Sequence, residues 1–202
     1  MPAEESGRLL LDRLRARTGL ASLDTANLLD FGCGVRFSQS ILNLGLPIGG
    51  YTGVDNYREM IEFLEDNVDD PRFRYVFLDA HHPLYNMNGA RLSASTRLPL
   101  PESSFDLAAM FSVITHQNPD DSRAIFTLLR RYIAPTGHVF FTCFLDDKLE
   151  TFEDRSPERN GGMCFYRPDY LVRIVEECGW REVNRAASEG PLIGDSFVFA
   201  PV

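Results

Sequence analysis

Two glycines separated by one residue follow a short apolar run, and an aspartate comes about twenty residues later. The run 27–31 predicts a buried strand that leads into Gly32 and Gly34, and a second predicted strand, 51–54, ends at Asp55. A strand that turns into a helix through glycines leaves backbone N–H groups open to a ligand. In doubly wound folds, an acid at the end of the next strand meets a ribose diol. The spacing therefore predicts a nucleotide-like ligand at these strand ends.

The residues around the glycines distinguish between classes of cofactor. A nicotinamide-binding fingerprint has the pattern Gly-x-Gly-x-x-Gly, usually without an acid before the first glycine. Here Asp30 precedes Gly32, and Phe37 stands three positions after Gly34. A further acid, Asp79, closes the third predicted strand, where it is placed to accept a hydrogen bond from an adenine amino group.

Five segments resemble motifs of the class I S-adenosylmethionine-dependent methyltransferases, and they occur in the order of that family. The resemblance runs from about residue 26 to the C-terminus. It implies an α/β fold, a Rossmann-like three-layer sandwich with a seven-stranded, mostly parallel sheet and an antiparallel last strand. It also implies S-adenosyl-L-methionine as methyl donor. The segments are Asp30-Phe31-Gly32-Cys33-Gly34, Tyr51-Thr52-Gly53-Val54-Asp55, Asp79-Ala80, Leu98 to Leu107 and Leu129 to Gly137.

The same resemblance assigns cofactor-binding positions along the chain. Asp30 is expected to bind the cofactor's amino group or to organise the glycine turn, Asp55 to bind the ribose and Asp79 the adenine. Cys33 reads as a small packing residue with no neighbour that suggests a nucleophile. The full predicted set is Asp30, Gly32, Cys33, Gly34, Asp55, Asn56, Asp79, Ala80, Phe111 and Ser112.

Arg36 departs from the family pattern, because the first motif usually carries a third glycine at this position. The side chain either narrows the cofactor site or reaches outward. Two alternatives to an active methyltransferase therefore stay open: an inactive binding module with this fold, and a nicotinamide-dependent oxidoreductase.

The segment Phe111 to His116 follows the fourth predicted strand, where the substrate crevice of an open α/β sheet lies. It resembles the Ser-Val-Phe-Thr-His segment of methyltransferases that act on sugars and small metabolites. A neutral imidazole can remove a hydroxyl proton while the oxygen attacks a methyl group. His116 is therefore the candidate catalytic base for O-methylation of a small, sugar-like acceptor. Capping of the next helix and contact with the cofactor's methionine part are the alternatives.

Two polar stretches, 81–101 and 146–166, are predicted as loops that cover the acceptor site, since connections of this length are often functional. His82, Tyr85 and Tyr166 are the candidate acceptor-binding residues in them. Adjacent histidines point in different directions, so no metal site is predicted, and a requirement for Mg²⁺ is left open.

An alternation of helical and strand patterns is predicted to position these residues. Such alternation is typical of a parallel, doubly wound sheet within a single domain over 1–202, with an N-terminal helix within 1–25. The predicted helices are 8–17, 37–44, 57–67, 122–133 and 168–178, and the predicted strands are 27–31, 51–54, 73–78, 105–111, 138–145, 180–184 and 196–200.

Composition argues against several partners. The 202 residues carry a net charge of −9, which repels phosphate backbones, so no nucleic-acid partner is expected. No apolar run suits a membrane span or a secretory signal. The four cysteines are scattered and read as reduced thiols, which favours the cytoplasm. A small-molecule acceptor is the expected partner, with a homodimer as a further option.

Overall fold

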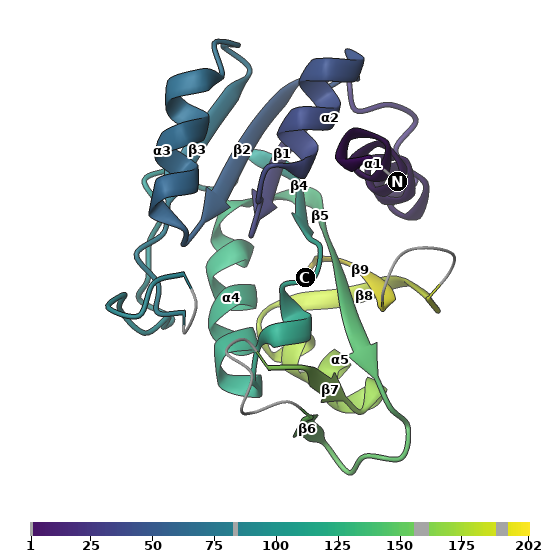
Figure 1. The fold of residues 1–202 in the computed structure, drawn as a ribbon. Helices are drawn as coiled ribbons and strands as arrows, with labels where there is room; N and C mark the ends of the chain where they lie inside the picture. Colours follow the sequence, from purple (N-terminus) through teal and green to yellow (C-terminus); the bar gives the residue numbers. More distant parts are fainter. Residues whose placement is uncertain (1, 83–84, 156–161, 189–193) are drawn as a thin grey trace.

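The computed structural model describes residues 2–82, 85–155, 162–188 and 194–202 (Figure 1). Helices and strands alternate along most of the chain, as the sequence patterns predict. In chain order the elements are α1 (Ala3–Thr18), β1 (Asn27–Phe31), α2 (Arg36–Leu44), β2 (Gly50–Asp55), α3 (Arg58–Asn67), β3 (Phe73–Phe77), β4 (Phe105–Met110), the 3₁₀ turn η1 (Ile114–His116), α4 (Pro119–Tyr132), β5 (Ile133–Leu145), β6 (Phe152–Asp154), β7 (Cys164–Tyr166), α5 (Pro168–Glu177), β8 (Trp180–Ala186) and β9 (Asp195–Pro201).

Within the described residues, seven of the nine connected strands form the main sheet, in the order β3-β2-β1-β4-β5-β9-β8. Neighbouring strands from β3 to β5 are parallel, whereas β9 runs antiparallel to both β5 and β8. The Rossmann-like sheet with an antiparallel last strand is therefore confirmed. Since the ends of β1, β2 and β4 point the same way, the residues that follow these strands gather at one edge of the sheet.

The stretch 146–166, predicted as a loop, contains the short hairpin β6–β7, so that prediction is wrong in part. Strand β7 pairs in parallel with the last residues of β5, Phe144 opposite Phe165, and β6 pairs with β7. In the stretch 81–101 the described residues form no helix or strand, and two isolated bridges connect Ala80 to Ala90 and His82 to Asn86.

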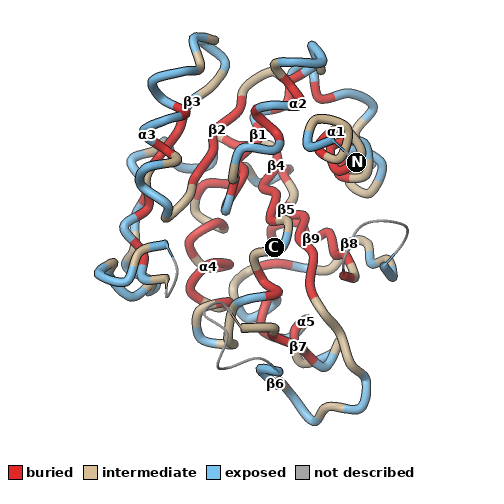
Figure 2. Tube along the Cα trace, in the orientation of Figure 1, coloured by how far each residue is buried: buried red, intermediate tan, exposed pale blue. Residues whose placement is uncertain are grey.

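The helices cover both faces of the sheet, and two apolar clusters result (Figures 1 and 2). Helices α1, α2 and α3 pack on one face, and α4 and α5 on the other. Successive strand residues are buried on opposite faces: Leu28 belongs to the cluster under α1, α2 and α3, and Leu29 to the cluster under α4 and α5. Among the described residues, no helix is long and apolar enough to cross a membrane.

Helix α4 begins at Pro119, three residues before the predicted start. The side-chain oxygen of Asn118 accepts hydrogen bonds from the backbone N–H groups of Asp120 and Asp121, at 2.9 and 3.0 Å. This cap closes the first turn, which apolar periodicity does not detect. The helix then gives way directly to β5 at Ile133, so the strand also starts earlier than predicted.

The N-terminal helix fixes the position of α2. The Ser40 hydroxyl lies within hydrogen-bond distance of two carbonyl oxygens, that of Glu4 at 2.7 Å and that of Arg36 at 2.9 Å. A side chain on Gly7 would collide with Ser40, so the two helices approach closely only because this residue is glycine. The first residue of α2, Arg36, is thereby held at the edge of the sheet where β1 ends.

Candidate functional site

A cavity of about 850 Å³ opens at the edge where β1, β2 and β4 end. Its volume lies in the range of small-molecule sites. The cavity brings together residues from segments that are far apart in the sequence. The predicted site residues that line it are Gly32, Gly34, Asp55, Asn56, Ala80, His82, Tyr85, Phe111, Ser112 and His116.

The glycine turn after β1 forms one wall. Gly32 has a φ of 75° and Gly34 a φ of 51°, both in the left-handed region that suits glycine. A Cβ on Gly32 would lie 2.6 Å from the Val113 side chain, whereas a Cβ on Gly34 would meet no atom within 4 Å. The turn therefore leaves room above Gly34 for a ligand to approach the main chain, as S-adenosylmethionine would require.

Asp55 binds the turn from the neighbouring strand. One carboxylate oxygen accepts a hydrogen bond from the N–H of Gly34 at 3.1 Å, and the other from the N–H of Tyr57 at 3.1 Å. Each oxygen can accept a second hydrogen bond. Because Asp55 and Asn56 line the cavity, this carboxylate can receive the hydroxyl groups of a ribose while it holds the turn in shape.

Asp30 does not line the cavity. It is 3% exposed and accepts a hydrogen bond from the Tyr51 hydroxyl at 2.7 Å. Burial raises the pKa of Asp30 to about 8, since the ionised form is poorly solvated there. The buried position gives Asp30 no path to a cofactor amino group, and its hydrogen bond to Tyr51 joins β1 to β2 just before the glycine turn.

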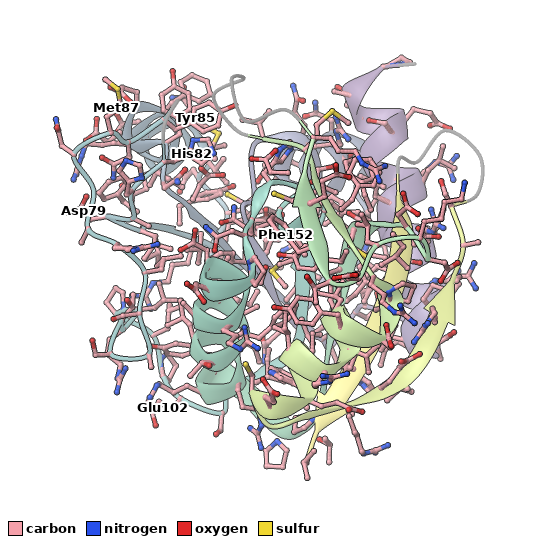
Figure 3. All side chains as sticks on the ribbon, turned by 90° about the horizontal axis from the view of Figure 1, so that it is seen from below. Asp79, His82, Tyr85, Met87, Glu102 and Phe152 are labelled. Carbon is pink, nitrogen blue, oxygen red and sulfur yellow. The ribbon has the colours of Figure 1, made fainter. Side chains whose placement is uncertain are left out.

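Cys33 and Asp79 also lie outside the cavity. The Cys33 thiol is buried against Gly53, and burial raises its pKa, which leaves it an inert packing group. The Asp79 side chain is exposed and accepts a hydrogen bond from Asn86 at 2.9 Å, on the outer side of the loop (Figure 3). The neighbouring Ala80 does line the cavity, so this strand end contributes an alanine and not a carboxylate.

The segment after β4 turns sharply into the cavity. Ser112 has a φ of 56°, unusual for a residue with a side chain, and its N–H donates to the Thr142 hydroxyl at 2.9 Å. Phe111 packs edge-on against Phe37, with ring centroids 5.3 Å apart. Strain of this kind is often held at functional sites, where neighbouring contacts over-determine the backbone.

His116 ends η1 and lines the cavity from the side of β4. Its Nδ1 lies 2.9 Å from the carbonyl oxygen of Gly162, just before β7. A carbonyl oxygen only accepts, so Nδ1 carries the proton and the lone pair of the neutral ring lies on Nε2. This is the tautomer that a general base needs, with the orientation set by the second nitrogen.

An aromatic stack also lines the cavity, and Figure 3 labels two of its members, His82 and Tyr85. The His82 ring stacks on Tyr85 with centroids 4.8 Å apart, and Tyr85 stacks on Tyr57 at 5.5 Å. Burial, with His116 nearby as a second cause, lowers the pKa of His82. The stack therefore gives the cavity an aromatic wall that includes an imidazole held neutral by its surroundings.

Tyr166 is not a cavity residue, contrary to the prediction from the sequence. The side chain is buried, and its hydroxyl donates to the carbonyl of Gln117 at 2.6 Å and contacts the Ser122 hydroxyl at 2.9 Å. Tyr166 thereby ties β7 to the segment that follows His116. Its role in the fold is to position the catalytic candidate indirectly.

Several lining residues were not predicted as site residues. Tyr57 and Met60 lie at the start of α3. The apolar periodicity there predicts a helix face that packs in the core, and it does not distinguish a side chain that faces a ligand. Leu92 and Met163 come from irregular segments with no pattern to use. Lining residues outside the predicted set include Arg36, Tyr57, Met60, Leu92, Gln117 and Met163. Within the described ranges, no three His, Cys, Asp or Glu side chains group in a way that could hold a metal ion.

Known proteins share this architecture. A family model described as a methyltransferase domain matches residues 4–184. The fold is similar to 1,6-didemethyltoxoflavin-N1-methyltransferase of Burkholderia thailandensis, solved with S-adenosylhomocysteine. That comparison gives a TM-score of 0.65 at 17% identity over 98% of this chain and 79% of that one.

Two other solved structures are comparably similar. One is an S-adenosylmethionine-dependent methyltransferase from Mesorhizobium loti, with a TM-score of 0.65 and 14% identity over 94% of this chain and 96% of that one. The other is the glycopeptide N-methyltransferase MtfA, with a TM-score of 0.65 and 14% identity over 100% and 91%. The family model spans most of the sequence, and the fold agrees with it: the chain belongs to the class I S-adenosylmethionine-dependent methyltransferases.

Proposed function

We propose that this methyltransferase transfers the methyl group to a hydroxyl oxygen of a small, sugar-like metabolite. The observation that carries the proposal is one shared cavity: the glycine turn and Asp55 line it at one side, and His116 lines it at another. A cofactor site and a candidate base thus open into the same cavity, where an acceptor can meet both.

The reaction is a direct displacement. S-adenosylmethionine supplies a methyl group made electrophilic by the positive sulfur. As the acceptor oxygen forms its bond to the methyl carbon, the carbon–sulfur bond breaks and the hydroxyl proton passes to Nε2 of His116. The hydrogen bond from Nδ1 to Gly162 stabilises the imidazolium that results. Positioning of the two reactants contributes the larger share of the rate, up to about 7–11 kcal/mol in favourable cases.

The lining of the cavity supports a ring-shaped acceptor. The stack of His82, Tyr85 and Tyr57 gives the cavity an aromatic wall, and the apolar face of a sugar ring can pack on such a wall while its hydroxyl groups remain free to hydrogen-bond. Four free cysteine thiols support the cytoplasm, a reducing compartment, as the place of reaction.

The decisive experiment follows labelled methyl groups from S-adenosylmethionine into panels of hydroxylated metabolites and of matched amines. We expect transfer to hydroxyl acceptors, and we expect His116→Asn to lower kcat by about 10²–10⁴-fold with cofactor affinity nearly unchanged. Asparagine is neutral and cannot take up the proton.

Three results would contradict the proposal in different ways. Transfer only to amines would make the enzyme an N-methyltransferase. Tight cofactor binding without transfer to either panel would favour an inactive binding module. A His116→Asn variant with weakened cofactor binding and normal turnover at saturation would make His116 a cofactor contact.

A further inference from the structure

One cationic side chain stands alone in the cavity. Among the described residues that line it, Arg36 is the only arginine or lysine. It is the first residue of α2 and lies two positions after Gly34, so it borders the part of the cavity formed by the glycine turn. The sequence has 29 acidic and 20 basic residues, yet the part of the cavity beside the glycine turn carries this cation.

The guanidinium of Arg36 has no hydrogen bond or ion pair with any residue in the described part of the chain. Other arginines differ: Arg72 pairs with Asp70 at 2.7 Å, and Arg123 with Glu177 at 3.0 Å. Asp55, which lines the same cavity, accepts one backbone hydrogen bond at each of its carboxylate oxygens and forms no ion pair with Arg36. A planar guanidinium without a partner is suited to grip a carboxylate through two parallel hydrogen bonds.

The N-terminus of α2 also favours an anionic ligand at this place. The first turn of this helix contains no acidic residue, so its N–H groups and the positive end of its dipole stay available to an anion. S-adenosylmethionine has one anionic group, the carboxylate of its amino-acid part, whereas its sulfur and its amino group are positive. The cavity therefore offers one positive side chain, and the cofactor has one negative group to match.

We propose that Arg36 binds the carboxylate of the cofactor's amino-acid part. This inference rests on the proposed binding of S-adenosylmethionine in the cavity. Anchored by Asp55 at the ribose and by Arg36 at the carboxylate, the cofactor is held at two points on either side of its sulfur. Arg36 is then a positioning residue that directs the methyl group toward the acceptor, at the place where the family usually carries a glycine.

Calorimetry with two ligands that differ only in the carboxylate tests this proposal. The probes are S-adenosylhomocysteine and its decarboxylated form, each titrated into the wild type, Arg36→Gln and Arg36→Lys. We expect Arg36→Gln to weaken S-adenosylhomocysteine by about five- to fifty-fold and the decarboxylated ligand by less than about two-fold. Arg36→Lys keeps the positive charge but cannot form two parallel hydrogen bonds to a carboxylate. Its affinity for S-adenosylhomocysteine should therefore lie between those of the wild type and Arg36→Gln.

Arg181→Gln is the matched control, because it removes an exposed arginine from β8, outside the cavity, and should leave both affinities unchanged. Equal losses for the two ligands in Arg36→Gln would overturn the proposal, since Arg36 would then act on the shape of the turn. Unchanged affinities with a raised KM for an acidic acceptor would overturn it in favour of acceptor binding.

The proposal and the proposed function fail in different ways. Binding of S-adenosylhomocysteine that depends on Arg36, without methyl transfer to any hydroxyl acceptor, would refute the O-methylation while Arg36 keeps its role. If the enzyme methylates hydroxyl groups but Arg36→Gln weakens S-adenosylhomocysteine and its decarboxylated form equally, only the proposed role of Arg36 is refuted.

Discussion

Asp30 and Asp55 end neighbouring strands, yet their carboxyl groups have different surroundings. Asp30 is buried against the Tyr51 hydroxyl, while Asp55 lines the cavity and accepts two backbone hydrogen bonds. Burial raises the pKa of Asp30 to about 8, so this acid is mostly protonated at neutral pH. Asp30 supports the strand end beneath the turn, and Asp55 is the acid that a ligand can reach.

This burial gives a test through stability. In the unfolded chain the Asp30 carboxyl ionises near pH 3.8, and in the folded protein only near pH 8. Between these values the unfolded state binds fewer protons, so the contribution of Asp30 to stability falls as pH rises, and it levels off above the folded pKa. Asp30→Asn cannot ionise, so its free energy of unfolding should lack this dependence on pH. The difference in free energy of unfolding between Asp30→Asn and the wild type should therefore rise, in favour of the variant, by on the order of a few kcal/mol from about pH 4 to about pH 8.

Urea unfolding of the wild type and Asp30→Asn across this pH range measures the effect. The slope of the difference is the diagnostic quantity, because any constant cost of the new amide group is the same at every pH. Parallel stability curves for the two proteins would mean that Asp30 ionises normally in the folded state.

Asp55 is expected to contribute directly to cofactor affinity. Asp55→Ala removes the acceptor for the ribose and the support of the Gly34 N–H, so S-adenosylhomocysteine should bind about ten- to hundred-fold more weakly in calorimetry. Asp79→Ala is the matched control, because its carboxylate is exposed and bonded to Asn86. An equal loss in Asp79→Ala would show that Asp79 contacts the adenine after all.

At the scale of the elements, the sequence predicts the strand ends well and the segments between them poorly. Apolar runs that stop at Gly32, Asp55 and Phe111 predict three neighbouring strand ends, and these do meet at one cavity. Strands β6 and β7 have three residues each and exist because β7 pairs with the end of β5. No local pattern encodes such a partner, so tertiary pairing decides the structure there.

The same limit applies to single side chains within the site. The strand-end motif predicts Asp30 and Asp55 equally, but the phenol of Tyr51, on the adjacent strand, buries only Asp30. Tyr57, Tyr85 and His82 form one stack from two separate segments. Spacing along the chain predicts which residue types reach the edge of the sheet, and packing between segments decides which of them face the ligand.

The glycine turn offers a test in which two similar substitutions should have different effects. Gly32→Ala places a Cβ 2.6 Å from Val113 and adds strain at a φ of 75°, so it should cost about 1–3 kcal/mol of stability. At Gly34, with a φ of 51° and no atom within 4 Å, alanine should cost less than Gly32→Ala. Its new methyl group instead enters the cavity and should weaken S-adenosylhomocysteine binding.

Denaturant unfolding and calorimetry on both variants separate the two effects. Gly32→Ala should lose more stability than Gly34→Ala. Gly34→Ala should lose more affinity for S-adenosylhomocysteine per unit of stability lost. If Gly34→Ala binds the ligand as the wild type does, the cofactor does not approach the main chain at this turn.

At the scale of the whole molecule, the cavity joins segments that would otherwise be linked only through the sheet. Gly34, His82, His116 and Gly162 come from four separate parts of the chain and border the same space. A ligand that contacts all of them binds the folded state and has no comparable site in the unfolded chain. Its binding free energy must therefore appear as added stability of the entire domain.

The last prediction uses this linkage to decide between cofactor classes. S-adenosylhomocysteine at about 100 times its Kd should stabilise the protein by about 2.7 kcal/mol, which for a chain of this size raises Tm by about 5–10 °C. NAD at the same concentration should leave Tm within about 1 °C, because the turn lacks the dinucleotide pattern. Thermal unfolding with and without a chelator provides the measurement. A shift with NAD and none with S-adenosylhomocysteine would reverse the choice of cofactor. A shift that needs Mg²⁺ would instead reveal a metal site built by the ligand itself, since the described side chains do not group to form one.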